Sequence, residues 1–128
     1  MTRFLSPEWL ALVEEAAGRD ERVRQASSTV ELTVRHVVRG GPQGDVAYTV
    51  RIADGVVRVR PGGTDGDVEL TQDYDTAVAI SRGMLTPAAA FATGRLKLGG
   101  RVDTLVRQGD ALAALTDAFA GVRETTEY

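Results

Sequence analysis

The sequence between residues 30 and 72 alternates apolar and polar side chains with a period of two. In its first stretch, Val34 and Val38 fall on one side, whereas Thr33 and Arg35 fall on the other. The same alternation recurs over residues 46–52, 57–60 and 68–71. It predicts four strands of a sheet that has one face in water and one face covered. Any fold for this chain must therefore place a second layer over the apolar face.

Short turn-forming segments separate the four predicted strands. They are residues 40–44 (GGPQG), 54–55 (DG) and 61–63 (PGG). Glycine, proline and aspartate favour tight turns, each for its own backbone reason. Three hairpin-like links in succession predict an antiparallel meander.

A helix is predicted before the first strand. Ser6 is a suitable N-cap, and Pro7 occupies the first helical position, where its missing N–H costs no hydrogen bond. Gly18 is the expected end of this helix. A short helical turn is expected to follow over residues 22–26.

The period changes from two to helical after the fourth strand. Asp73 can cap one helix and Thr86 the next, while residues 95–98 (RLKL) predict a fifth strand. A long helix is then expected over residues 103–122, with Gly109 as a position where it can bend.

The order helix, four strands, two helices, strand, helix predicts a single α+β domain over residues 1–128. We expect a five-stranded, mostly antiparallel sheet with helices packed on one face. A chain of 128 residues can bury a core of its own. Its hydrophobic share of 43% and charged share of 26% are usual for a globular protein. Folding should therefore need neither a disulfide nor a metal.

The net charge of −3 argues against a nucleic-acid partner and against anionic membrane surfaces, both of which select dense positive patches. No segment approaches the ~20 apolar residues of a membrane span, so we expect no stable membrane insertion. We expect a cytoplasmic protein, consistent with the absence of cysteine. Lys97 is the only lysine beside many arginines, which suggests a GC-rich bacterial genome.

Catalytic residues are scarce in this sequence. His36 is the only histidine and lies on the apolar face of a predicted strand. We interpret it as a core or cavity-edge residue with one hydrogen bond, not as a general base. Asp65, Asp67 and Glu69 look superficially like calcium ligands, but the further ligands of a calcium loop are missing. The sequence thus predicts a protein that is not an enzyme and has no metal or cofactor.

Large apolar side chains gather after the fourth strand, where the second layer must cover the sheet. They include Met84, Leu85 and Phe91, followed by a stripe on the last predicted helix. Helical spacing of this kind is compatible with an ordinary core and with the wall of a ligand cavity. The spacing alone does not decide between the two.

Residues 68–115 resemble the C-terminal half of the sterol carrier protein type 2 family. The family pattern has an Asp-led helix, a Gly-hydrophobic break, a P-x-x-A-F-x-x-G helix and a G-K/R-L-K-L-x-G strand. The corresponding segments here are DYD at 73–75, GML at 83–85, PAAAFATG at 87–94 and RLKLGG at 95–100. The preceding helix and four strands agree with the family fold by their order.

The resemblance implies non-covalent binding of a hydrophobic ligand, such as a fatty acid, an acyl thioester or a sterol-like lipid, in a cavity between sheet and helices. His36 is then the inward polar group expected to orient a carboxylate or hydroxyl, and Phe91 could plug or wall the interior. We expect the following side chains to face the ligand: Val34, His36, Val50, Ile52, Ile80, Met84, Leu85, Phe91, Leu112, Leu115 and Phe119. The alternative is a protein-interaction or scaffold module with a filled core and no ligand. A copy of such a fold could also form a homodimer through its sheet or last helix.

Overall fold

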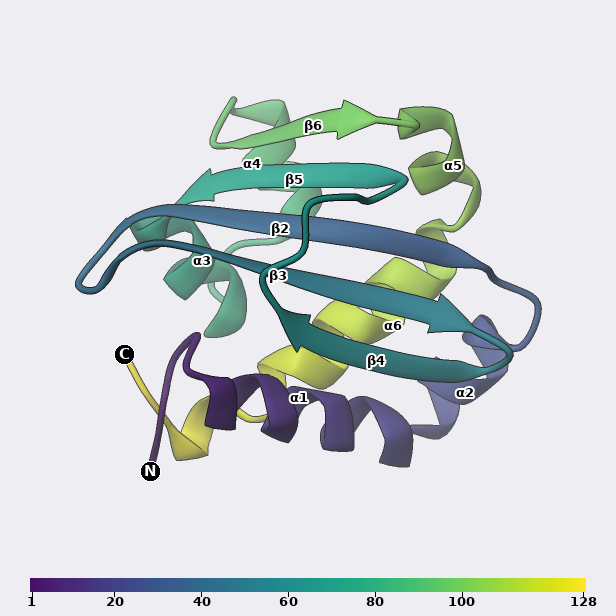
Figure 1. Cartoon of the computed structure of the whole chain (residues 1–128), viewed down its shortest axis with the longest axis horizontal. Coiled ribbons are helices and arrows are strands. Elements are labelled where there is room, and N and C mark those ends of the chain that lie inside the picture. Colours follow the sequence, from purple (N-terminus) through teal and green to yellow (C-terminus); the bar gives the residue numbers. More distant parts are fainter.

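A five-stranded sheet runs through the computed structural model, which describes residues 1–128 (Figure 1). Its strands are β2 (Leu32–Gly41), β3 (Gly44–Ala53), β4 (Val56–Pro61), β5 (Val68–Asp73) and β6 (Leu96–Gly100). Their order across the sheet is β4-β3-β2-β5-β6, and every neighbouring pair is antiparallel except β2 with β5. The predicted α+β fold with a mostly antiparallel five-stranded sheet is confirmed.

The predicted meander is wrong at its third link. The first two links are hairpins, but β5 lies beside β2 and runs parallel to it. The chain leaves β4 and crosses the outer face of the sheet, where Arg35 Nε donates to Gly63 O at 2.8 Å and Thr49 Oγ1 donates to Gly62 O at 2.8 Å. The glycines permit the change of direction, but a turn does not specify which strand the chain reaches next.

Six helices lie on the other side of the sheet (Figure 1). They are α1 (Pro7–Arg19), α2 (Glu21–Ser27), α3 (Tyr74–Ser81), α4 (Pro87–Ala92), α5 (Val102–Arg107) and α6 (Gly109–Ala120). The predicted N-caps Ser6, Asp73 and Thr86 each accept a hydrogen bond from the backbone N–H three residues on. The expected long last helix breaks before Gly109 and forms α5 and α6.

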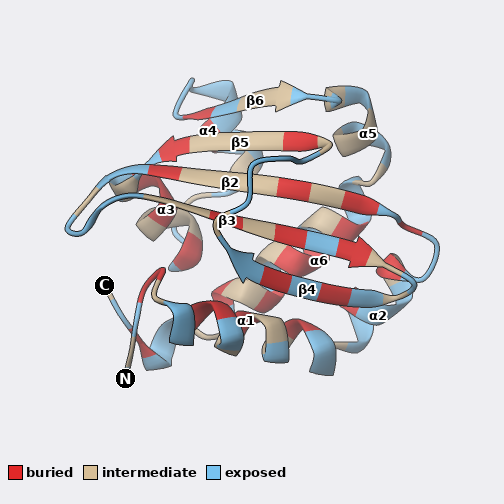
Figure 2. Ribbon diagram, in the orientation of Figure 1, coloured by how far each residue is buried: buried red, intermediate tan, exposed pale blue.

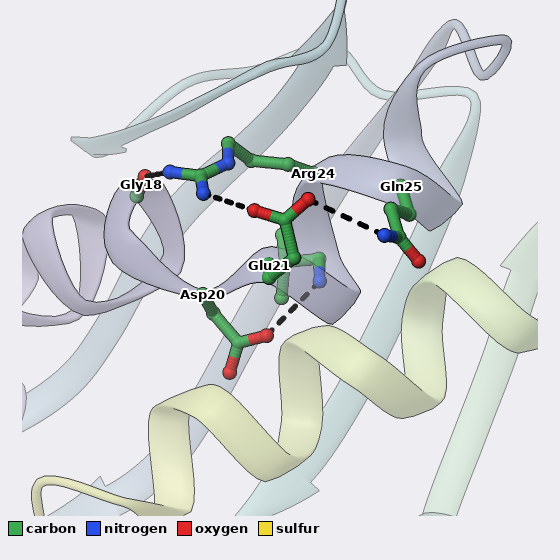
Figure 3. A network of polar contacts seen from close by, with 6 residues as sticks. Gly18, Asp20, Glu21, Arg24 and Gln25 are labelled. Atoms are coloured by element: carbon green, nitrogen blue, oxygen red, sulfur yellow. Dashed lines mark hydrogen bonds and ion pairs between the residues drawn. The ribbon is translucent and has the colours of Figure 1, made fainter.

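The first helix ends slightly later than predicted, at a corner that Figure 3 shows. Asp20 follows α1 and caps α2 by accepting from Val23 N at 3.1 Å. Arg24 reaches back to Gly18 O at 3.2 Å and also pairs with Glu21, whose pKa this hydrogen bond lowers. One aspartate thus ends one helix and begins the next.

The two ends of the chain form a second, very small sheet that the sequence did not predict. Strands β1 (Thr2–Arg3) and β7 (Thr126–Glu127) pair in parallel, and Phe4 N donates to Glu127 O at 2.8 Å. The Phe4 ring then packs against Trp9, with 4.9 Å between ring centroids. Strands of two residues are too short to show an alternating pattern.

The core lies between the inner face of the sheet and helices α1 and α6 (Figure 2). The predicted inward residues Leu32, Val34 and Ile52 are at most 1% exposed. Trp9 from α1 and Leu115 from α6 are also buried in this cluster. The expectation that helices cover one face of the sheet is therefore confirmed.

Candidate ligand-binding site

The helices cover the inner face of the sheet unevenly. Strand pairing places Tyr48, His36, Leu70 and Leu98 in one row across β3, β2, β5 and β6. Tyr48 is buried, but the other three are only half-buried. On β5, Leu70 lies between Val68, which is fully buried, and Gln72, which is also buried. We call the half-buried residues His36, Leu70 and Leu98 the inner strip.

The inner strip lies between two groups of helices. Helix α3 packs against β2 and β5 and α4 against β6, while α5 contacts the other end of β5 (Figure 1). Apolar side chains of α3, the α3–α4 loop, α5 and α6 are half-buried as well, namely Ile80, Leu85, Leu105, Leu112 and Phe119. Sheet and helices together thus present an apolar surface that is neither sealed nor fully open.

The polar groups of this region are buried and largely unpartnered. The His36 ring stacks on Tyr48, with 4.5 Å between centroids and 4° between planes. Its Nδ1 atom is buried without a hydrogen-bond partner, so the single hydrogen bond expected there is missing. Gln72 Oε1, also buried, has no partner either.

Burial sets the charge state of the stacked pair. It lowers the pKa of His36 to about 4 and raises the pKa of Tyr48 above its usual range. Both rings are therefore neutral at neutral pH, because a charged ring would lose its hydration in this environment. The site offers hydrogen bonds but no fixed charge.

The structure divides the eleven predicted ligand-facing residues into three groups. Buried in the core are Val34, Val50, Ile52 and Leu115. Half-buried are His36, Ile80, Leu85, Leu112 and Phe119, of which Leu112 and Phe119 pack against the core cluster. Exposed are Met84, at 75%, and Phe91, at 53%. Contact of any of them with a ligand stays a prediction.

Phe91 was expected either to plug the interior or to wall a cavity; at 53% exposed it does not plug the interior, and the second role stays a prediction. Ala90 is the fully buried residue of α4, and successive side chains on a helix point about 100° apart. The small Ala90 side chain lets α4 lie close to β6, and this packing turns Phe91 outward. Leu70 and Leu98 were predicted to face inward but were not among the predicted ligand-facing residues, and Gln72, two residues beyond Leu70 on the same face of β5, was not predicted.

Two hollows open on the surface away from the predicted residues. One, of about 260 Å³, is lined by Arg51, Ala53, Asp54, Val56 and Arg58 at the β3–β4 hairpin. The other, of about 500 Å³, lies between α2 and the α5–α6 junction and is lined by Arg22, Gln25, Ala26, Thr29, Val30, Arg107, Gln108, Asp110 and Ala111. None of the predicted ligand-facing residues lines either hollow.

No three His, Cys, Asp or Glu side chains come together in a way that could hold a metal ion. None of the helices is both long and apolar enough to span a bilayer.

These features define a class: an α+β protein with a partly uncovered apolar surface between its five-stranded sheet and its helices. The model of the SCP-2 sterol transfer family matches residues 10–111. The chain therefore belongs to the SCP-2 sterol transfer family. The resemblance drawn from its C-terminal half is confirmed and extends into the first helix.

Solved structures show the same fold. A crystal structure of sterol carrier protein 2 matches with a TM-score of 0.80 at 22% identity, covering 92% of this chain and 98% of that one. The sterol carrier protein domain 2 of Helicoverpa armigera matches with a TM-score of 0.67 at 27% identity, covering 89% of this chain and 87% of that one. Palmitated SCP2L2 from Aedes aegypti matches with a TM-score of 0.63 at 20% identity, covering 89% of this chain and 94% of that one. Among curated proteins, no sequence matches this chain.

Proposed function

We propose that this protein binds a hydrophobic small molecule non-covalently between its sheet and its helices, and so acts as a carrier. The ligand class is a fatty acid, an acyl thioester or a sterol-like lipid. The observation that carries the proposal is the inner strip. Leu70 and Leu98 lie on the apolar face of the sheet and yet remain half-buried, between two groups of helices.

Two comparisons support the proposal. The family to which the chain belongs is named for sterol transfer. The Aedes aegypti relative of the same fold was solved in palmitated form. Both point to long apolar molecules as the ligand class.

The energetics suit an exchangeable ligand. Burying a sixteen-carbon chain at ~0.8 kcal/mol per CH₂ gives ~12 kcal/mol gross. Association and ordering cost ~4–15 kcal/mol, so the net affinity is modest. An empty cavity of ~400 Å³ would cost ~10 kcal/mol at ~24 cal/mol per Å³, comparable with the stability of a whole domain. The ligand-free protein should therefore close over the site instead of keeping a dry tunnel.

Helix α5 is the element we propose to move when a ligand enters. It has no buried residue and no side-chain cap, and α6 begins without a side-chain cap as well. Its apolar residues Leu105 and Val106 are half-buried and 75% exposed, respectively. Segments with few buried contacts open at the lowest free-energy cost.

We further propose that binding involves no chemical step. A general base needs a partner that orients it, and His36 Nδ1 has no hydrogen-bond partner. Its neighbour is the flat face of Tyr48, which packs against the imidazole. In this proposal the ring contacts the ligand and moves no proton.

The first test is native mass spectrometry of protein purified from cells, together with analysis of an organic extract. The carrier proposal predicts a co-purified lipid at up to one molecule per chain. A clean, highly stable apo-protein that binds no added lipid would support the scaffold alternative instead. The same spectra show whether two copies associate into the proposed homodimer.

A matched pair of variants tests the position of the site. Leu70→Trp should fill the inner strip and weaken binding of dodecanoate at least about tenfold, measured by titration calorimetry. Thr71→Trp places the same side chain on the outer face, one residue along β5, and should leave binding unchanged. Circular dichroism checks that both variants fold. Equal affinity for both would contradict the proposed position.

A further inference from the structure

Four buried polar side-chain atoms have no hydrogen-bond partner, and two of them lie on the same face of neighbouring strands. The four are Trp9 Nε1, Ser27 Oγ, His36 Nδ1 and Gln72 Oε1. His36 is paired with Leu70, and Val38 is paired with Gln72. His36 and Gln72 therefore belong to successive inward-facing pairs of β2 and β5, two residues apart along the strands. Buried polar atoms normally find a partner, and unpaired ones need an explanation.

We infer that the inner strip takes an uncharged lipid carrying a hydroxyl group, bound with the hydroxyl inward between His36 and Gln72. This inference rests on the proposed function, because it specifies the ligand of the same site. Such a ligand would give His36 Nδ1 and Gln72 Oε1 one hydrogen bond each, both to the same hydroxyl group.

The spacing of the two side chains suits a single bridging oxygen. Neighbouring strands lie about 4.8 Å apart and two residues span about 6.6 Å, so the two Cα atoms are about 8 Å apart. From these Cα positions both side chains are long enough for one ligand oxygen between them to hydrogen-bond to Nδ1 and to Oε1, two atoms that would then lie within ~5.5 Å of each other. Leu70 lies next to both and would contact the first carbons of the ligand.

The chemistry of the two atoms selects a hydroxyl. Gln72 Oε1 can only accept, so the ligand must donate a proton to it. The neutral His36 ring can carry its proton on Nδ1 and donate to the ligand oxygen in return. A hydroxyl makes both bonds at once, whereas an ionised carboxylate has no proton for Gln72 Oε1 in the amide orientation seen here.

The surroundings disfavour a carboxylate in the same place. None of the buried residues is charged, so an inward carboxylate would meet no buried cation, and the Nε of the neighbouring Arg95 already donates to Thr76 Oγ1 at 3.1 Å. The low pKa of His36, about 4, also leaves the imidazole uncharged at neutral pH. A fatty acid could still bind, but with its carboxylate outward in water.

The test compares two ligands of equal chain length, 1-dodecanol and dodecanoate, by titration calorimetry at pH 7. The wild type should bind dodecanol at least about tenfold more tightly. Gln72→Leu keeps the volume but removes the acceptor, and should weaken dodecanol binding about tenfold while leaving dodecanoate within about twofold. His36→Phe keeps the stacking on Tyr48, and it should likewise weaken dodecanol binding while leaving dodecanoate binding within about twofold.

Ser27→Ala is the matched control. It removes a buried unpartnered oxygen on α2, away from the inner strip, and should change neither affinity. The inference would be overturned if the wild type bound the two ligands equally. It would also be overturned if the Gln72→Leu and His36→Phe variants bound dodecanol as the wild type does. Either result would leave the carrier function standing. Failure of the wild type to bind either ligand would overturn both.

Discussion

At the scale of single residues, the stacked pair His36 and Tyr48 characterises the site best. The two residues lie opposite each other on β2 and β3, and their rings are almost parallel. Stacking covers one face of each ring, and burial keeps both uncharged at neutral pH by lowering the pKa of His36 and raising that of Tyr48. A polar pair thus fits an apolar surface without needing a charged partner.

The depressed pKa of His36 predicts a pH dependence of stability. An unfolded histidine binds a proton near pH 6.5, whereas folded His36 does so only near pH 4. Between these values the unfolded chain holds the extra proton, so the free energy of unfolding falls as the pH falls, by up to about 3 kcal/mol. Urea unfolding at several pH values measures this.

His36→Phe should remove that contribution. The difference in unfolding free energy between wild type and variant should change across pH 6.5 to 4 and stay constant above pH 7.5. Carboxylates titrate in both proteins and cancel in the difference. Curves that run parallel over the whole range would show that His36 is not buried as described.

The sequence predicted which way His36 points but not what it touches. Alternation in β2 is local, so it placed the ring on the apolar face. Its contact with Tyr48 depends on the register of a hairpin, and its lack of a hydrogen bond depends on how distant helices pack. The exposure of Phe91 was missed for the same reason, because tertiary packing decides which side of α4 meets β6. Met84 lies between α3 and α4, where helical spacing does not apply.

At the scale of elements, β6 is held between two glycines with left-handed backbone angles. Gly94 and Gly100 both have φ of +77°. A Cβ on Gly100 would lie 2.5 Å from Asp67 O, whereas a Cβ on Gly94 would meet nothing within 4 Å. Arg101 N donates to the same Asp67 O at 2.8 Å, which ties the end of β6 to the start of β5.

Alanine at the two glycines should therefore have unequal effects. Gly94→Ala introduces only backbone strain, about 1 kcal/mol. Gly100→Ala adds a collision with a backbone oxygen and should destabilise the protein by at least about 2 kcal/mol. Chemical denaturation of both variants measures the difference. Equal losses would mean that the end of β6 does not lie close to Asp67.

Elements fixed by local chemistry were predictable, and those fixed by distant contacts were not. Caps such as Ser6 and Asp73 bond to an N–H three residues away, so their sequence signals suffice. The crossing from β4 to β5 and the pairing of the chain ends join segments that local patterns do not connect. Hence the five strands of the sheet were predicted, but the connection from β4 to β5 was not.

At the scale of the whole molecule, the sheet and the helices share one core that is sealed at one end and loose at the other. Helices α1 and α6 bury the residues near Val34 and Ile52, whereas the cover over Leu70 and Leu98 is incomplete. Sequence patterns assign side chains to a face but do not give the separation of two layers. The cavity therefore stays a proposal, which rests on the half-buried inner strip and on the family.

Methyl NMR of the labelled protein, titrated with whichever of dodecanol and dodecanoate binds more tightly, tests the location of the ligand most directly. We predict saturable shift changes at Leu70, Leu98 and Ile80, and none at Val37 and Val56 on the outer face. Shift changes confined to the outer face, or no saturable change at any methyl group, would contradict binding between the sheet and the helices.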